Sequence, residues 1–151
     1  MRLLVLGFTG GVVATGTMTA FRMPISRALP PTENFWAKYI GSEELEEYHL
    51  PAMILHALYG AVAGSIFAVS FPEIDDHSPA GTETTGLVGG ILYSVPFTAL
   101  GEVVLLNRML EMDLDSNESM IFHAGHLVYG ISLGAWVGSR YDTLANEDDF
   151  G

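Results

Sequence analysis

The pattern that decides the fold occurs twice, as His56-Ala-Leu-Tyr-Gly-Ala-Val-Ala-Gly64 and as His126-Leu-Val-Tyr-Gly-Ile-Ser-Leu-Gly134, and both copies lie inside long apolar runs. A second correspondence joins the first apolar run to the third. Five residues match at a constant offset: Gly7, Gly10, Gly11, Thr19 and Ala20 against Gly86, Gly89, Gly90, Thr98 and Ala99. The sequence therefore predicts an internal repeat, in which one unit of two apolar segments is present twice.

Apolar and acidic residues are segregated along the chain of 151 residues. Hydrophobic residues make up 49% and the net charge is -12, yet of the 18 acidic residues only Glu102 lies inside an apolar run. Four segments have about the 20 residues that a helix needs to cross a bilayer: Leu3–Phe21, Pro51–Phe71, Thr85–Leu106 and Ser119–Ser139. The predicted fold is all-α, a four-transmembrane-helix bundle built from two helical hairpins in parallel repeat.

The whole chain forms a single integral membrane domain in this prediction. Its parts are repeat one at about 3–71 with a long connection at 22–50, repeat two at about 85–139, and an acidic tail at 140–151. In the long connection an aromatic stripe recurs at helical spacing around Lys38: Phe35, Trp36, Tyr39 and Ile40. The stripe predicts a short helix, either in the headgroup layer of the bilayer or folded over the bundle as a surface helix.

Lysine and arginine are distributed unevenly between the two ends of the predicted bundle. One end has only Arg2 and Arg140, whereas the connections inside the repeats carry Arg22, Arg27, Lys38 and Arg108. By the positive-inside rule, this bias predicts a cell-membrane protein with both termini outside. The acidic connections exclude nucleic acid as a partner, because its phosphates would be repelled. Four short helices enclose little interior, which favours a homo-oligomer or a place in a larger membrane complex.

Each apolar segment carries a row of small residues four positions apart. In lipid, small residues at this spacing let two helix backbones approach closely, so these rows are the predicted helix contacts. The glycines in the rows are Gly7 and Gly11, Gly60 and Gly64, Gly86 and Gly90, and Gly130, Gly134 and Gly138. Most of these glycines fall in the predicted outer leaflet, so the bundle should be tightly packed on that side.

Polar residues of the same rows fall in the predicted inner leaflet, where they indicate a polar pocket. The candidates for this pocket are Glu102, His56, His126, Thr19, Thr98 and Arg22. A carboxylate inside a span costs about 2.5 to 3.5 kcal/mol on insertion scales, so Glu102 should face the interior or have a partner. His56, His126, His123 and Arg22 are the candidate partners. The pocket is either a proton- or ion-responsive site or a static buried pair.

The repeated histidines, His56 and His126, allow a second hypothesis. Facing each other across the axis of the repeat, they could be the axial ligands of a haem b in an electron-transfer protein. A pair of structural histidines with hydrogen bonds to neighbouring helices explains the same pattern. No other metal site is indicated, because no set of Glu, Asp and His residues completes one on a single helix. No phosphate-binding loop, nucleophile elbow or zincin helix is present, so we expect no enzymatic activity.

Two short motifs carry a resemblance to other proteins. They are Gly10-Gly-Val-Val-Ala-Thr-Gly-Thr-Met-Thr-Ala-Phe-Arg-Met-Pro24 and Leu55-His-Ala-Leu-Tyr-Gly60. In these motifs, and in its acid-rich connections, the chain resembles small uncharacterised four-helix integral membrane proteins of halophilic archaea. The resemblance implies the fold and no activity. We therefore expect a non-enzymatic accessory or transport-type membrane module, with no cofactor unless the histidines bind haem b.

Overall fold

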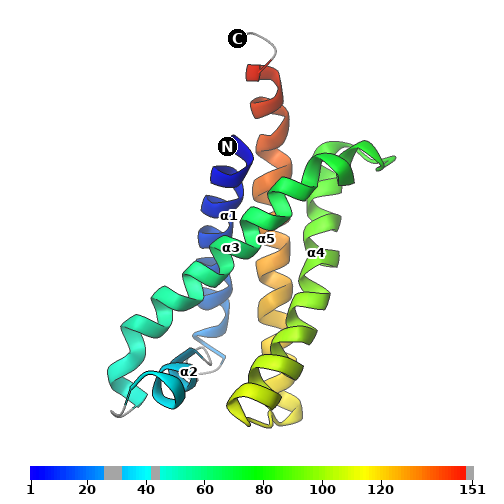
Figure 1. Cartoon of the computed structure of the whole chain (residues 1–151). Coiled ribbons are helices and arrows are strands. Elements are labelled where there is room, and N and C mark those ends of the chain that lie inside the picture. Colours follow the sequence, from blue (N-terminus) through cyan, green and yellow to red (C-terminus); the bar gives the residue numbers. More distant parts are fainter. Residues whose placement is uncertain (26–31, 42–44, 149–151) are drawn as a thin grey trace.

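The computed structural model of the chain describes residues 1–25, 32–41 and 45–148, and these ranges form helices joined by short connections, without a strand (Figure 1). Its elements are α1 (Arg2–Arg22), α2 (Thr32–Tyr39), the 3-10 helix η1 (Leu45–Tyr48), α3 (His49–Asp76), α4 (Thr82–Leu100), the π-helix η2 (Gly101–Leu110) and α5 (Ser116–Asp148). The all-α prediction is confirmed. The aromatic stripe of the long connection forms a short helix, α2, as expected.

Four helices of the described ranges are long and apolar enough to cross a membrane. These are Arg2–Arg22, His49–Asp76, Thr82–Leu110 and Ser116–Leu144. Much of their apolar surface is exposed, for example at Val62 (58%) and Leu92 (66%). Exposed apolar surface of this extent suits contact with lipid better than contact with water. The structure is therefore that of a multi-pass membrane protein.

The helices pack in pairs. Helix α1 packs on α3, α4 packs on α5, and contacts between α1 and α5 join the two hairpins, whereas α3 and α4 touch little. The start of α1 and the end of α5 lie at one end of the bundle with the connection between α3 and α4, and α2 lies at the other end (Figure 1). We call these the terminal end and the α2 end. Towards the α2 end, α3 and α4 diverge (Figure 1).

Glycine permits the close contact within each hairpin. In the first hairpin, a Cβ at Gly7 would overlap the carbonyl oxygen of Gly64, and a Cβ at Gly11 would overlap that of Gly60. The second hairpin shows the same contacts: a Cβ at Gly86 meets the Gly134 oxygen and one at Gly90 meets the Gly130 oxygen. Gly138 lies against the backbone of Glu83. Any side chain larger than hydrogen at these positions would push the helices apart.

Larger side chains fill the space between the hairpins. The main core cluster includes Met18 of α1, Phe67 and Phe71 of α3, and Leu133 and Val137 of α5. A second cluster of Leu106, Leu110 and Phe122 lies at the α2 end, where Phe35 of α2 packs against it. Helix α2 thus covers the end of the bundle, as in the surface-helix alternative for the aromatic stripe.

Two hydrogen-bond donors attach α2 to the end of η2. Lys38 Nζ lies 2.9 Å from the Met109 carbonyl oxygen and 2.9 Å from Glu111 Oε1, and Tyr39 Oη donates to the same Met109 oxygen at 2.7 Å. Glu111 ends η2 in the left-handed region with φ 55°, a conformation that non-glycine residues adopt only when neighbouring contacts hold it. The ion pair with Lys38 is one such contact.

The helix boundaries differ from the prediction in three main places. Helix α3 does not end at Phe71 but continues through Pro72 to Asp76. The third span does not end at Leu106 but continues as η2 to Leu110, because Leu106 and Leu110 are themselves buried. The acidic tail predicted at 140–151 begins as a continuation of α5, which runs to Asp148. No glycine or proline interrupts this segment, and Tyr141 and Leu144 pack against the core, so the helix has reason to continue.

Candidate functional site

A chain of polar contacts surrounds Glu102, the one carboxylate inside an apolar run. His123 Nε2 lies 2.7 Å from Glu102 Oε2, and Ser119 Oγ donates to Glu102 Oε1 at 2.8 Å. On the other side of the imidazole, His123 Nδ1 lies 2.9 Å from Thr98 Oγ1. We call these four residues the Glu102 network. It joins α4 and η2 to α5 near the α2 end of the bundle.

Helical spacing and a cap position the members of the network. Thr98 and Glu102 are four residues apart on one helix, and Ser119 and His123 are four apart on the facing helix, so each pair shares a face. Helix α5 begins with a capping box. Asp115 Oδ1 accepts from the Glu118 backbone N–H at 2.9 Å, and Glu118 Oε2 accepts from the Asp115 backbone N–H at 3.1 Å. The cap fixes the first turn of α5, which carries Ser119.

A π-helix carries Glu102 itself. Hydrogen bonding from residue i to i+5 widens the turn and rotates later side chains away from the positions of a regular α-helix, and such turns are frequent at functional sites. Gly101 lies at the start of η2, where a Cβ would come 3.3 Å from Phe122 Cζ. The small residue lets α5 approach the turn that carries the carboxylate.

The contact between Glu102 and His123 holds a proton between nitrogen and oxygen, because two acceptors would not approach to 2.7 Å. With the proton on Nε2, a neutral ring has Nδ1 free to accept from the Thr98 hydroxyl. The Glu102 side chain is 23% exposed and the His123 side chain 41% exposed.

The order hydroxyl, imidazole, carboxylate in this network is also that of a nucleophilic triad. Thr98, however, is only 7% exposed, and its hydroxyl lies within the contact between α4 and α5. A substrate carbonyl could not reach it without separation of the helices. The geometry suits proton exchange better than nucleophilic catalysis.

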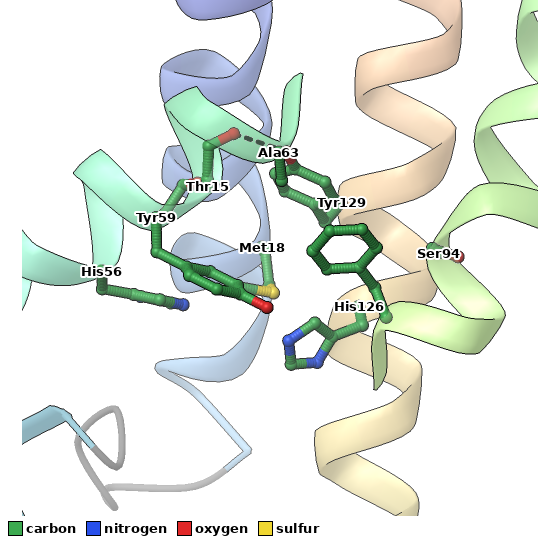
Figure 2. Close-up of a pocket in the computed structure, with 10 residues that line it drawn as sticks. Thr15, Met18, His56, Tyr59, Ala63, Ser94, His126 and Tyr129 are labelled. Atoms are coloured by element: carbon green, nitrogen blue, oxygen red, sulfur yellow. Dashed lines mark hydrogen bonds between the residues drawn. The ribbon is translucent and has the colours of Figure 1, made fainter. Parts of the chain in front are cut away.

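The two repeated histidines lie apart from this network, around a small cavity (Figure 2). Its volume is about 20 Å³, enough for one water molecule. The lining residues come from α1, α3, α4 and α5: Thr15, Met18, His56, Tyr59, Gly60, Ala63, Ser94, Phe97, His126 and Tyr129. In the view of Figure 2, the Tyr59 ring lies between His56 and His126.

The histidines differ in their hydrogen bonds. His126 Nδ1 donates to the Phe122 carbonyl oxygen at 2.9 Å, so in the neutral ring Nε2 is left as an acceptor. His56 Nδ1 is buried and has no hydrogen-bond partner. Tyr129 Oη donates to the Gly60 carbonyl oxygen at 2.7 Å and closes one side of the cavity (dashed line in Figure 2).

This cavity does not fit haem b. A porphyrin is far larger than a space for one water molecule, and Tyr59 and Phe97, whose ring centroids are 6.0 Å apart, lie within the same lining. His126 has the Nδ1 hydrogen bond that histidine ligands often show, but His56 has none. Within the described ranges, no group of three or more His, Cys, Asp and Glu residues could hold a metal ion either.

The predicted single pocket is therefore divided in the structure. Thr98 and Glu102 join His123, whereas His56 and His126 line the cavity. Thr19 joins neither group and donates to the Thr15 carbonyl oxygen of its own helix at 2.8 Å. Arg22 lies at the end of α1, beside Gly125 of α5.

Two contributors were missed from the sequence. Ser119 bonds Glu102, and its place one helical turn before His123 was the available signal. Tyr59 lines the cavity with its repeat counterpart Tyr129, one turn after each repeated histidine.

Comparison of the chain with protein-family models, with curated proteins and with solved structures gives no match. The function must therefore be argued from the site alone.

Proposed function

We propose that this chain is a non-enzymatic membrane module, of accessory or transport type, in which the Glu102 network is a proton- or ion-responsive site. The observation that carries the proposal is a carboxylate within the span Thr82–Leu110 that contacts an imidazole at 2.7 Å. Ionisable residues inside membrane spans are rare and costly, and they commonly mark proton relays or ion pathways. The partial exposure of both side chains supports proton access.

A change in protonation would alter a contact between helices in this site. With Glu102 ionised, its two oxygens accept from His123 and Ser119, and this holds η2 against the start of α5. Protonation of the carboxylate removes the charge attraction and replaces an acceptor by a donor. The other ionisable groups near the site are His126, one turn from His123 on α5, and Arg22, which interacts electrostatically with His126.

We further propose that the two hairpins are copies of one unit and that only the second acquired this site. The matching glycine contacts of the hairpins support common descent. By the repeat alignment, Thr98 corresponds to Thr19, but Glu102 corresponds to Met23 and His123 to Met53. The first unit thus has no counterpart of the carboxylate or of its imidazole partner.

The membrane orientation belongs to the same proposal. The connections inside the two predicted repeats carry Arg22, Arg27, Lys38 and Arg108 in the sequence, so by the positive-inside rule that side faces the cytoplasm. The acid-rich connections suit a protein of a salt-loving archaeon, where carboxylates keep surfaces hydrated. A homo-oligomer or a larger complex would cover part of the exposed apolar surface.

The chain contains no cysteine, so single introduced cysteines report the orientation directly. Asp113→Cys lies at the α2 end and Ser78→Cys at the terminal end. In intact cells, a membrane-impermeant maleimide is expected to label Ser78→Cys, while Asp113→Cys reacts only after lysis. Labelling in the opposite order would reverse the assignment.

The function itself is tested with purified protein in liposomes and in detergent. We expect the wild type to show either a proton or cation flux, read with a pH-sensitive or ion-sensitive dye, or a melting temperature that depends on pH. Glu102→Gln should remove that response, and Glu83→Gln, an exposed carboxylate at the terminal end, should keep it. A wild type without flux whose pH profile equals that of Glu102→Gln would refute the proposal.

A further inference from the structure

The Arg22 side chain has no carboxylate partner among the described residues. The chain has 18 acidic and only 6 basic residues, yet within the described ranges the Arg22 side chain makes no ion pair and no hydrogen bond. Its Nε atom is fully buried and unpartnered. Lys38, by contrast, pairs with Glu111, and Arg140 stacks on the Trp136 ring at 3.7 Å.

The side chain of Arg22 folds into the bundle. A Cβ at Gly125 of α5 would come 2.9 Å from Arg22 Cδ and 3.4 Å from Met18 Cγ, so the arginine stem lies directly against the backbone of α5. Gly125 leaves the space for it. An arginine at the end of a span usually extends its charge towards the headgroups, but here the Nε atom is held between helices.

Among the residues that the structure describes, the ionisable groups that interact with Arg22 are nitrogen groups and not carboxylates. Arg22 interacts electrostatically with His56 of α3 and with His126 of α5. The further electrostatic partners of these two imidazoles are each other and His123. The nearby carboxylate, Glu102, contacts His123, with its Oε2 atom 2.7 Å from His123 Nε2. The buried Nδ1 of His56 and the buried Nε of Arg22 are two unpartnered nitrogens of one cluster.

The cluster is reachable from the bilayer. Helices α3 and α4 are joined by the hydrogen bond from Tyr93 Oη to the Ala63 carbonyl oxygen, at 2.8 Å, and diverge from there towards the α2 end (Figure 1). In this opening Tyr59 is 50% exposed. Leu58 of α3 and Leu100 of α4 are also exposed, at 49% and 60%. Acyl chains can therefore pass alongside the cluster.

We propose that Arg22, with His56, forms an anion site for the phosphate of a membrane lipid headgroup at the α2 end, between α1, α3 and α5. A guanidinium offers paired donors to phosphate oxygens, and an imidazole N–H adds a further donor. Basic pockets between membrane helices on the cytoplasmic side bind anionic headgroups in this way. The site is independent of the proposed function, since no atom of the Glu102 network belongs to it.

The test compares the protein in nanodiscs of phosphatidylcholine alone with nanodiscs that contain equal parts of phosphatidylcholine and phosphatidylglycerol. We expect a higher melting temperature in the anionic lipid, and anionic lipid retained on the purified protein in native mass spectrometry. Arg22→Gln should lower the affinity for the anionic lipid about tenfold or more, as expected for the loss of a charge-assisted hydrogen bond. Arg108→Gln, an exposed arginine at the same end, should leave it unchanged.

Additional experiments distinguish a lipid headgroup from a free anion and replace a variant that does not fold. Inorganic phosphate added to protein in phosphatidylcholine shows whether a free anion suffices; saturation by millimolar phosphate with the same dependence on Arg22 would keep the anion site but remove the lipid as its occupant. If Arg22→Gln does not fold, Arg22→Lys and His56→Phe replace it, and each should weaken retention of the lipid. An undiminished response to anionic lipid in the Arg22 and His56 variants would overturn the proposal.

Discussion

The hairpins α1–α3 and α4–α5 are alike at the terminal end and different at the α2 end. Near the terminal end, glycine lies against a carbonyl at corresponding positions, at Gly7 and Gly64 in one hairpin and at Gly86 and Gly134 in the other. Near the α2 end, the second hairpin has the Glu102 network, whereas the first has an unpaired arginine beside the cavity. Backbone packing that tolerates no side chain leaves little freedom to change, so chemical differences between the hairpins are concentrated at the opposite end.

Substitution of a glycine at the close backbone contacts should lower the free energy of unfolding more than any other change, and by a similar amount in both hairpins. Gly11→Ala places a Cβ against the Gly60 carbonyl, and Gly90→Ala does the same at Gly130, so both should destabilise the protein by about 3 kcal/mol. Gly16→Ala, with nothing within 4 Å, is the matched control and should be neutral or slightly stabilising. Steric-trapping measurements of unfolding in bicelles give these values. Equal effects at Gly11 and Gly16 would show that the contact is not tight.

Breaking the Glu102 network should have the next largest effect, and only in the second hairpin. A double-mutant cycle of Glu102→Gln and His123→Gln should give a coupling free energy of about 1 to 2 kcal/mol, because the pair is only partly exposed. The corresponding cycle in the first hairpin, Met23→Gln with Met53→Gln, should give a coupling near zero. A coupling of similar size in both cycles would mean that the hairpins do not differ in this respect.

Tyr59 and Tyr129, which occupy the same place in the two His-x-x-Tyr-Gly motifs, should give the smallest changes in the free energy of unfolding. Tyr129→Phe should cost about 1 kcal/mol, because it removes the hydrogen bond to the Gly60 carbonyl between α5 and α3. Tyr59→Phe removes a hydroxyl that has no protein partner in the described structure, so its cost should be within the error of the measurement. Unfolding free energies of both variants under one set of conditions decide the matter.

The sequence predicted the helices and their packing rows well because both depend on local pattern. A span is recognised by its length and apolarity, and residues four apart share a helix face whatever the neighbouring helix is. The short helix around Trp36 followed from the same spacing. The continuation of α5 to Asp148 was missed because the acidic composition of the tail outweighed its lack of helix-breaking residues.

The partner of Glu102 was harder to predict. The predicted depth in the membrane left four candidate partners for Glu102. Which of them contacts it depends on how each helix is rotated and on which helices are neighbours, and the structure shows that it is His123. The π-helical turn around Glu102 changes that rotation in a way that a regular period cannot foresee. The same limit applies to Arg22, because the space beside Gly125 exists only once α1 and α5 have packed together.

Helix α2 gives this architecture a mechanical consequence. It belongs to the connection of the first hairpin, yet its Lys38 and Tyr39 both bond the Met109 carbonyl at the end of the second hairpin's π-helix. Through these two bonds α2 ties the first hairpin to the π-helix that carries Glu102, so the two hairpins are linked at the α2 end as well as by the contacts between α1 and α5.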